Sequence, residues 1–104
     1  MGMEQLSDFD QCAGRLKALA DPKRLRIVTN LFAGPKTVSQ ITEALGDDMV
    51  LISHHLGILR ASMIVVATKR GRFVEYALHP DVKGHEADAN CKQIDFGCCR
   101  LDIS

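Results

Sequence analysis

The sequence predicts a mainly α-helical domain that carries one β-hairpin. Residues 37–62 have the pattern of a short helix, a tight turn at Gly46 and a second helix, because apolar residues recur at helical spacing on both sides of the glycine. Residues 65–78 have the pattern of two strands joined by a turn at Arg70-Gly71, where glycine tolerates a positive φ. This order of elements predicts a winged helix-turn-helix fold, which can place one helix in a DNA major groove and a basic loop on the neighbouring backbone.

Two helices are expected before this unit. Ser7 or Asp8 can cap the first helix, which we expect to run to about residue 20. The apolar side chains of this helix are Leu16, Leu19 and Ala20. Asp21-Pro22 begins the second helix, because aspartate is a good N-cap and proline suits the first helical position. The apolar side chains of the second helix are Leu25, Val28, Leu31 and Phe32.

The helix-turn-helix unit has recognisable caps and a core side. Thr37 opens the third helix, with Gln40 in position for a capping box, and Asp48 caps the fourth helix over residues 49–62. The expected inner face of the third helix is Val38, Ile41, Ala44 and Leu45. The expected core stripe of the fourth helix is Ile52, Leu56, Leu59 and Met63. The residues left to face outward are Ser53, His54 and Gly57.

The last residues are harder to assign to one kind of secondary structure. Residues 81–90 are polar and contain Gly84, which predicts a loop or a weak helix. Further on, the apolar side chains alternate as in a strand: Cys99, Leu101 and Ile103. Because Gly97 also disfavours a helix, we expect an extended tail.

Length and composition indicate one small domain. The chain has 104 residues, of which 46% are apolar, and domains of this size often dimerise to bury more surface. No stretch is long or apolar enough to span a membrane. The acidic, polar N-terminus also differs from a secretory signal, so we expect a cytoplasmic location.

The net charge is zero, but the charge is unevenly distributed. Residues 51–80 hold Arg60, Lys69, Arg70 and Arg72 against Glu75 alone, whereas residues 81–104 hold five acidic and three basic side chains. Contact with phosphates depends on local charge. The hairpin region therefore remains suited to DNA despite the neutral total.

The chain has four cysteines, three of them within the last fourteen residues: Cys12, Cys91, Cys98 and Cys99. In a cytosolic chain such a cluster is more often metal-binding or redox-active than a disulfide framework. Thiolates are soft ligands that suit As(III), Cd(II), Pb(II), Zn(II) or Cu(I), and three thiolates satisfy As(III). Nearby side chains that could complete a harder, zinc-like site are His85, Glu86 and Asp88.

Two alternatives for the cysteines remain open. Cys91 or Cys12 could pair with Cys98 or Cys99 on oxidation, which would make a redox sensor without a metal. Cysteine is also often buried as a small apolar side chain with no ligand at all.

Three segments carry a resemblance to the ArsR/SmtB family of winged-helix repressors. They are LKALADPKRLRIV at residues 16–28, SHHLGILR at 53–60 and KRGRFVEYAL at 69–78. The resemblance covers residues 16–78 and implies a homodimer that binds operator DNA and releases it when an inducer binds. It also implies that the first helix and the C-terminal segment pack together at the dimer interface, where Cys12 could join the tail cysteines. We therefore divide the chain into a DNA-binding domain with an N-terminal dimerisation helix, residues 1–80, and a cysteine-rich tail, residues 81–104, that is a candidate inducer site and dimer contact.

The chain departs from the family pattern at the start of the fourth helix. This region is usually polar in the family, but here it is Met49-Val50-Leu51. Apolar side chains can contact thymine methyl groups, although they could equally weaken DNA binding or serve a protein contact. The family's paired cysteines before the SHHL-like stretch are also missing, so that arsenic or cadmium site is absent.

The candidate DNA contacts lie on the two elements that would face a duplex. Basic side chains at the hairpin tip can bind phosphates or enter the minor groove. The full candidate set is Gln40, Met49, Leu51, Ser53, His54, Arg60, Lys69, Arg70 and Arg72. His55 lies beside the core stripe and is expected to be a partly buried, hydrogen-bonded histidine. A metal shared with His54 is not expected, because neighbouring side chains on a helix diverge by about 100°.

The leading hypothesis is therefore a dimeric transcriptional repressor that needs no cofactor to bind operator DNA. Its inducer would be a thiophilic ion (arsenite, Cd, Pb, Zn or Cu) bound by the C-terminal cysteines with Cys12. The first alternative is a thiol redox-responsive repressor without a metal. A thiol enzyme, a metal carrier or a protein-interaction module on the same fold are further alternatives. An enzyme is not expected, because the sequence shows neither a phosphate loop nor a nucleophile–base pair at a recognisable spacing.

Overall fold

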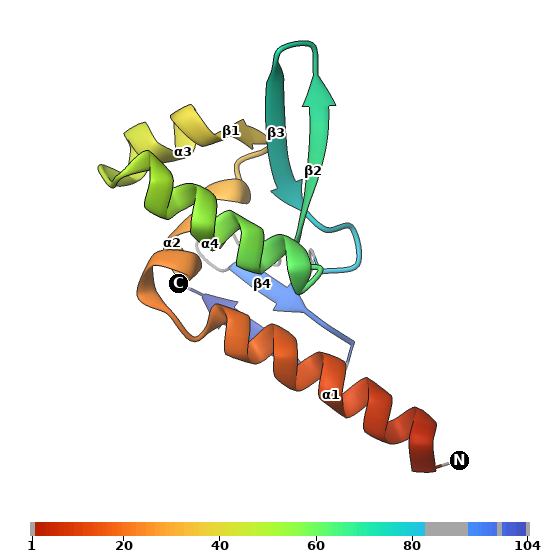
Figure 1. The fold of residues 1–104 in the computed structure, drawn as a ribbon. Helices are drawn as coiled ribbons and strands as arrows, with labels where there is room; N and C mark the ends of the chain where they lie inside the picture. Colours follow the sequence, from red (N-terminus) through yellow and green to blue (C-terminus); the bar gives the residue numbers. More distant parts are fainter. Residues whose placement is uncertain (1, 83–91, 98, 104) are drawn as a thin grey trace.

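The computed structural model describes residues 2–82, 92–97 and 99–103. Within these ranges the chain forms four helices and two small antiparallel sheets (Figure 1). The helices are α1 (Gly2–Leu19), α2 (Pro22–Leu31), α3 (Val38–Leu45) and α4 (Met49–Ala61). The strands are β1 (Lys36–Thr37), β2 (Val65–Arg70), β3 (Phe73–Leu78), β4 (Lys92–Asp95) and β5 (Arg100–Ile103). A mainly helical fold with a hairpin after the helix-turn-helix unit confirms the predicted winged helix-turn-helix class.

Local side-chain chemistry starts three of the helices where the sequence predicts. The Asp21 carboxylate accepts hydrogen bonds from the backbone N–H groups of the first turn of α2. Thr37 and Gln40 form a reciprocal capping box, in which each side-chain oxygen accepts from the other residue's backbone N–H at 3.2 and 2.9 Å. The Asp48 carboxylate caps α4 by accepting from the backbone N–H of Val50, and Gly46 ends α3 with a left-handed φ of 69°.

Helix α1 starts earlier than predicted. It begins at Gly2, not at a cap formed by Ser7 or Asp8. Its buried side passes through Cys12, Ala18 and Leu19, which leaves Leu16 at the edge of that face with 38% of its surface exposed. Of the three apolar side chains that the sequence marks on this helix, only Leu19 is buried, while Leu16 and Ala20 are exposed.

The hairpin formed by β2 and β3, which we call the wing, projects beyond the helices (Figure 1). Arg70 pairs with Phe73 in the last register position, and Gly71 stands in the turn with a φ of 61°. The turn is thus Gly71-Arg72 and not Arg70-Gly71. The two-residue strand β1 pairs with the other edge of β3, and it is too short to leave a sequence pattern.

The core lies between the helices and the base of the wing. Its largest fully buried side chains are Ile27, Val28, Ile41, Ile52, Leu56, Leu59, Ile64, Val65, Val82 and Ile94. Met63 does not belong to it, because α4 ends at Ala61 and Met63 follows with a φ of 58° and half of its surface exposed. Ala44 is exposed as well, so the predicted inner face of α3 is narrower than expected.

The tail packs on this core as a second hairpin. Strands β4 and β5 pair with Ile94 opposite Leu101, and Ile94 is fully buried. The backbone N–H of Asp95 donates to the carbonyl oxygen of Val82 at 2.9 Å. Strand β5 confirms the predicted extended tail, whereas the loop or weak helix expected over residues 81–90 lies, beyond Val82, outside the described residues.

No helix in the described part of the chain has the length and hydropathy needed to cross a membrane.

Two glycines of the helix-turn-helix unit are expected to respond oppositely to alanine. Neither Cβ would meet another atom, so backbone conformation alone decides the outcome. Gly46→Ala should lower the free energy of unfolding by about 1–2 kcal/mol, because φ is left-handed there. Gly57→Ala, inside α4, should raise it by about 0.5–1 kcal/mol. Urea denaturation measures both, and equal effects at the two positions would contradict the assignment.

Candidate nucleic-acid interface and cysteine pair

One side of α4 is exposed along its whole length. Because residues three and four apart share a helix face, Val50, Ser53, His54, Gly57 and Arg60 form a single stripe, which we call the outer face of α4. Every one of these residues is exposed, and the stripe lies opposite the buried side of the helix. The small residues of this stripe, Ser53 and Gly57, leave room for another molecule to approach the helix backbone.

The start of this face differs from the sequence prediction. Val50 was not among the predicted contacts, yet 75% of its surface is exposed, whereas Leu51 is partly buried. Met49 is also exposed, at 47%. The signal for Val50 was present in the sequence, since it lies three and four residues before Ser53 and His54.

Gln40 is exposed on α3, and the capping box fixes its orientation. Its side-chain oxygen accepts from the Thr37 N–H at 2.9 Å, so its amide NH₂ group is the part left to donate outward. Gln40 therefore presents a donor with a defined direction.

The wing carries the predicted cations at its tip. Lys69, Arg70 and Arg72 are exposed, and the Arg70 Nε atom lies 3.3 Å from a carboxylate oxygen of Glu75. An exposed ion pair of this kind contributes little to stability, and Arg70 can easily exchange Glu75 for another anion. Phe73 adds an apolar side chain at the tip with 65% of its surface exposed, and the sequence prediction treated it only as a strand residue.

The inner side of α4 is joined to α2 by a group of polar residues that we call the polar junction: Asp21, Lys23, Arg24, Asp47 and His55. His55 is buried, with 7% of its surface exposed, and its Nδ1 lies 3.2 Å from the Arg24 Nη1. A guanidinium only donates, so Nδ1 accepts and the imidazole is neutral. This confirms that His55 is hydrogen-bonded, and its burial is more complete than expected.

The surroundings of His55 favour its neutral form. Burial is the largest cause that lowers its pKa below 6.5, and Arg24, His54 and Lys23 lower it further, while Asp21 acts in the opposite direction.

The two carboxylates of the polar junction are held in their charged form. The pKa of Asp21 is lowered mainly by the backbone N–H of Arg24. The pKa of Asp47 is lowered mainly by Lys23, whose ammonium lies 3.1 Å from the carboxylate, and next by the backbone N–H of Asp48.

Among the described residues, the structure brings two cysteines close together. The sulfur atoms of Cys12 on α1 and Cys99, which precedes β5, lie 3.6 Å apart and form what we call the cysteine pair. Cys12 is buried and disulfide-bonded, while Cys99 is a partly buried free thiol. The other predicted ligands lie outside the described residues: Cys91, Cys98, His85, Glu86 and Asp88. Among residues 2–82, 92–97 and 99–103, no three metal-binding side chains gather into one cluster.

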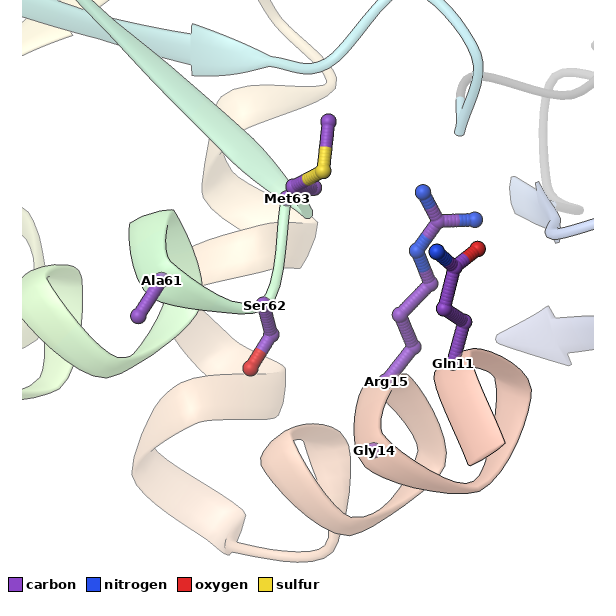
Figure 2. Close-up of a pocket in the computed structure, with 6 residues that line it drawn as sticks. All are labelled: Gln11, Gly14, Arg15, Ala61, Ser62 and Met63. Atoms are coloured by element: carbon purple, nitrogen blue, oxygen red, sulfur yellow. The ribbon is translucent and has the colours of Figure 1, made fainter. Parts of the chain in front are cut away.

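A cavity of about 330 Å³ separates α1 from the end of α4 (Figure 2). Gln11, Gly14 and Arg15 line it from α1, and Ser62 and Met63 line it from the far side. The Arg15 guanidinium also lies 5.6 Å from the centre of the Phe96 ring, a cation–π distance. Sequence patterns gave no sign of this cavity, because its walls come from segments about fifty positions apart.

Stability is expected to depend on pH through His55. Its folded pKa lies below 6.5, the ordinary value that it takes in the unfolded chain, so the unfolded chain binds more protons between those two values. The free energy of unfolding should be highest above pH 6.5 and fall as the pH drops from 6.5 towards the lowered pKa. Asp21 and Asp47 do not act in this range, because their pKa values lie below 3.8.

Urea denaturation on both sides of pH 6.5 measures this dependence. His55→Asn, which keeps an acceptor but cannot titrate, should flatten the profile between 6.5 and the lowered pKa. His54→Asn on the outer face is the matched control and should retain most of the pH dependence, because His54 is one of the smaller causes that lower the pKa of His55. An unaltered slope in His55→Asn would assign the dependence to another group.

Comparison with known proteins agrees with this architecture. The family model described as "Bacterial regulatory protein, arsR family" matches residues 21–65. The chain is 42% identical over 69 residues to the transcriptional regulator NmtR of Mycobacterium tuberculosis, covering 66% of this chain and 58% of NmtR. It is 35% identical over 66 residues to the transcriptional repressor SdpR of Bacillus subtilis, covering 64% of this chain and 73% of SdpR. The matched part thus spans little more than half of NmtR.

A solved structure shows the same fold. It is the homodimeric winged helix-turn-helix DNA-binding domain Mb0332 of Mycobacterium bovis, a possible ArsR-family regulator. The TM-score is 0.71 at 30% identity, over 74% of this chain and 71% of that one. These relatives are transcriptional regulators and not enzymes, in agreement with the expectation from the sequence. The chain therefore belongs to the ArsR family of bacterial regulatory proteins.

Proposed function

We propose that this chain is a transcriptional repressor that binds operator DNA as a homodimer. Two features observed together carry the proposal. The outer face of α4 is exposed and contains the small residues Ser53 and Gly57, and the wing carries three exposed cations. The relative SdpR is named a transcriptional repressor, which supports repression as the direction of control.

The outer face of α4 is the part that enters the major groove. Ser53 and Gly57 let the helix backbone approach the bases, and Val50 supplies an apolar contact of the kind that thymine methyl groups accept. Lys69 and Arg72 bind phosphates beside the groove, which positions the helix without reading sequence. Gln40 adds a side-chain donor from α3.

Recognition of the operator requires a second copy of the chain. Two recognition helices about 34 Å apart reach successive major grooves, so the operator should be an imperfect inverted repeat. Phe9 and Leu16 leave apolar surface exposed on α1, at 64% and 38%, which supports α1 as a dimerisation helix. The Mb0332 domain is described as homodimeric.

The proposed inducer is a thiophilic metal or metalloid ion held by the cysteine pair. Two thiolates on one tetrahedral zinc ion are about 3.8 Å apart, given metal–sulfur distances of about 2.3 Å. The 3.6 Å between the Cys12 and Cys99 sulfur atoms fits this spacing. Cys12 must first be released from its disulfide, because the thiolate is the metal ligand. A third thiolate would come from Cys91 or Cys98.

Inducer binding would act on DNA affinity through α1 and the tail. Such an ion supplies strong bonds to thiolates, and it would draw Cys12 of α1 and Cys99 beside β5 to fixed positions. A change of about 1–3 kcal/mol in favour of the released state is enough for a useful switch. DNA binding itself requires no cofactor in this scheme.

A redox-responsive repressor is the second candidate. The observation that favours it is that the free Cys99 thiol lies 3.6 Å from the sulfur of the disulfide-bonded Cys12. Attack by the Cys99 thiolate would form a Cys12–Cys99 bond and release the earlier partner of Cys12 as a thiolate. Because this exchange conserves the number of disulfides, the redox signal is the oxidation that first forms the Cys12 disulfide. Two thiols then lose two electrons and two protons to a cellular oxidant such as a peroxide, and no metal takes part.

The division into residues 1–80 for DNA binding and 81–104 for sensing remains part of the proposal, as does a cytoplasmic location. Buried Ile94 attaches the tail directly to the helical core, which would let a change in the tail reach the DNA-binding part.

The wing cations are expected to set the salt dependence of DNA binding. Arg72→Gln should weaken binding about equally on all sequences and reduce the slope of log affinity against log salt by about 1, because one phosphate contact is lost. Fluorescence anisotropy on the DNA upstream of the chain's own gene measures this. Lys17→Gln, which removes an exposed cation from α1, is the control and should leave the slope unchanged.

Removing one sulfur of the pair separates the two sensing schemes. With the protein reduced, Cd(II) should weaken DNA binding about 5- to 150-fold, and Cys99→Ser should abolish this effect while retaining the affinity measured without the ion. The Cd–thiolate absorption in the ultraviolet should fall in parallel. Release by an oxidant but not by Cd(II) would reject the metal scheme and favour the redox candidate.

A further inference from the structure

One guanidinium group connects three helices of the DNA-binding unit. Arg24 lies in the first turn of α2, and its Nε donates to the carbonyl oxygen of Ala18 near the end of α1. Its Nη1 donates to Nδ1 of His55 in the middle of α4, at 3.2 Å. The same side chain thus holds the end of α1 and the recognition helix at once.

His55 is well placed to control the direction of α4. It is buried beside the core residues Leu56 and Leu59, and its neighbour His54 stands on the outer face. A side chain with so little exposed surface cannot move independently of its helix. A change in the position of His55 therefore changes where the outer face points.

The start of α4 is attached to the same turn of α2. The Lys23 ammonium lies 3.1 Å from the carboxylate of Asp47, and Asp47 also accepts from the backbone N–H of Asp48, the N-cap of α4. Lys23 thus holds the beginning of the helix while Arg24 holds its middle. Two points of attachment fix a direction, whereas one would allow the helix to pivot.

At the other end of α4 the structure is hollow. The 330 Å³ cavity lies where Gln11 and Arg15 of α1 face Ser62 and Met63 (Figure 2). The pocket is open to solvent and large enough to hold water, so the side chains on its two walls are not closely packed against each other. The pocket interrupts the packing of α1 against the end of α4, so the hydrogen bonds of Arg24 are the directional connection between these helices.

We propose that Arg24 is a positioning residue, whose shared contacts with Ala18 and His55 set the direction of the recognition helix relative to α1. The meaning of this contact for regulation rests on the proposed function, since α1 carries Cys12 and α4 carries the DNA-facing stripe. Arg24 acts through His55 and touches no DNA.

Three substitutions isolate the contact. Arg24→Met removes both hydrogen bonds and retains the apolar part of the side chain. Arg24→Lys keeps the charge but replaces the planar guanidinium, with its several N–H donors, by a single ammonium group. His55→Leu fills the same space without an acceptor. His55→Asn restores an acceptor near the position of Nδ1 and serves as the rescue. Arg26→Met is the matched control, because Arg26 is an exposed cation on the same helix.

Hydrogen exchange of the free protein, resolved by helix, is the first readout. Arg24→Met and Arg24→Lys should speed exchange about tenfold in α4 and at the end of α1, relative to β2 and β3, because partly buried hydrogen bonds of Arg24 are lost or weakened. His55→Leu should speed exchange in α4 alone. His55→Asn and Arg26→Met should match the original chain within about twofold. Equal acceleration in every element would show a merely structural role and overturn the proposal.

Affinity for the upstream DNA is the second readout. Arg24→Met should weaken binding about tenfold with an unchanged salt slope, since no phosphate contact is removed. A slope reduced by about 1 would make Arg24 a phosphate contact and overturn the proposal. Failure of the original chain to bind DNA would instead reject the proposed function, and the exchange pattern would still decide whether Arg24 positions α4.

Discussion

Helix α4 has to bury one side and leave the other free, and the rest of the fold follows from this constraint. Its inner side places Ile52, Leu56 and Leu59 in the core with no exposed surface. Complete burial of each such side chain is worth about 1.5–3 kcal/mol, so rotation of the helix would be costly. The opposite side is thereby held toward solvent, where Ser53 and Gly57 are accessible. The apolar core thus determines which residues can meet DNA.

Apolar packing determines which side of α4 faces the core, but it does not determine the direction of the helix axis relative to α1. The polar junction determines that direction. Burying the His55 imidazole, and partly burying the Arg24 guanidinium, is unfavourable unless each finds a partner. Arg24 and His55 satisfy one another, and the carbonyl oxygen of Ala18 takes a second donor. Hydrogen bonds are directional where apolar contacts are not, so the junction can distinguish arrangements of the helices that bury similar apolar areas.

The cysteine pair links the two ends of the chain. Cys12 and Cys99 are 87 positions apart, and their sulfur atoms meet because α1 and the second hairpin pack on the same core. Local sequence could suggest that the tail cysteines act together, but it could not say which of them would reach α1. The structure places the free Cys99 thiol beside the disulfide-bonded Cys12, and a sensing event at this pair would act where α1, the tail and the core already touch.

The sequence by itself determined the features that depend on neighbours along the chain. The caps at Thr37 and Asp48, the order of the helices and the pairing of the wing strands each require only residues a few positions apart, so short patterns predict them. Tertiary structure decided the exposure of Met63, the cavity beside α1 and the contact of Arg24 with His55. Each of these depends on segments brought together from distant positions, and their relative placement comes from burial of the shared core, which no local pattern encodes.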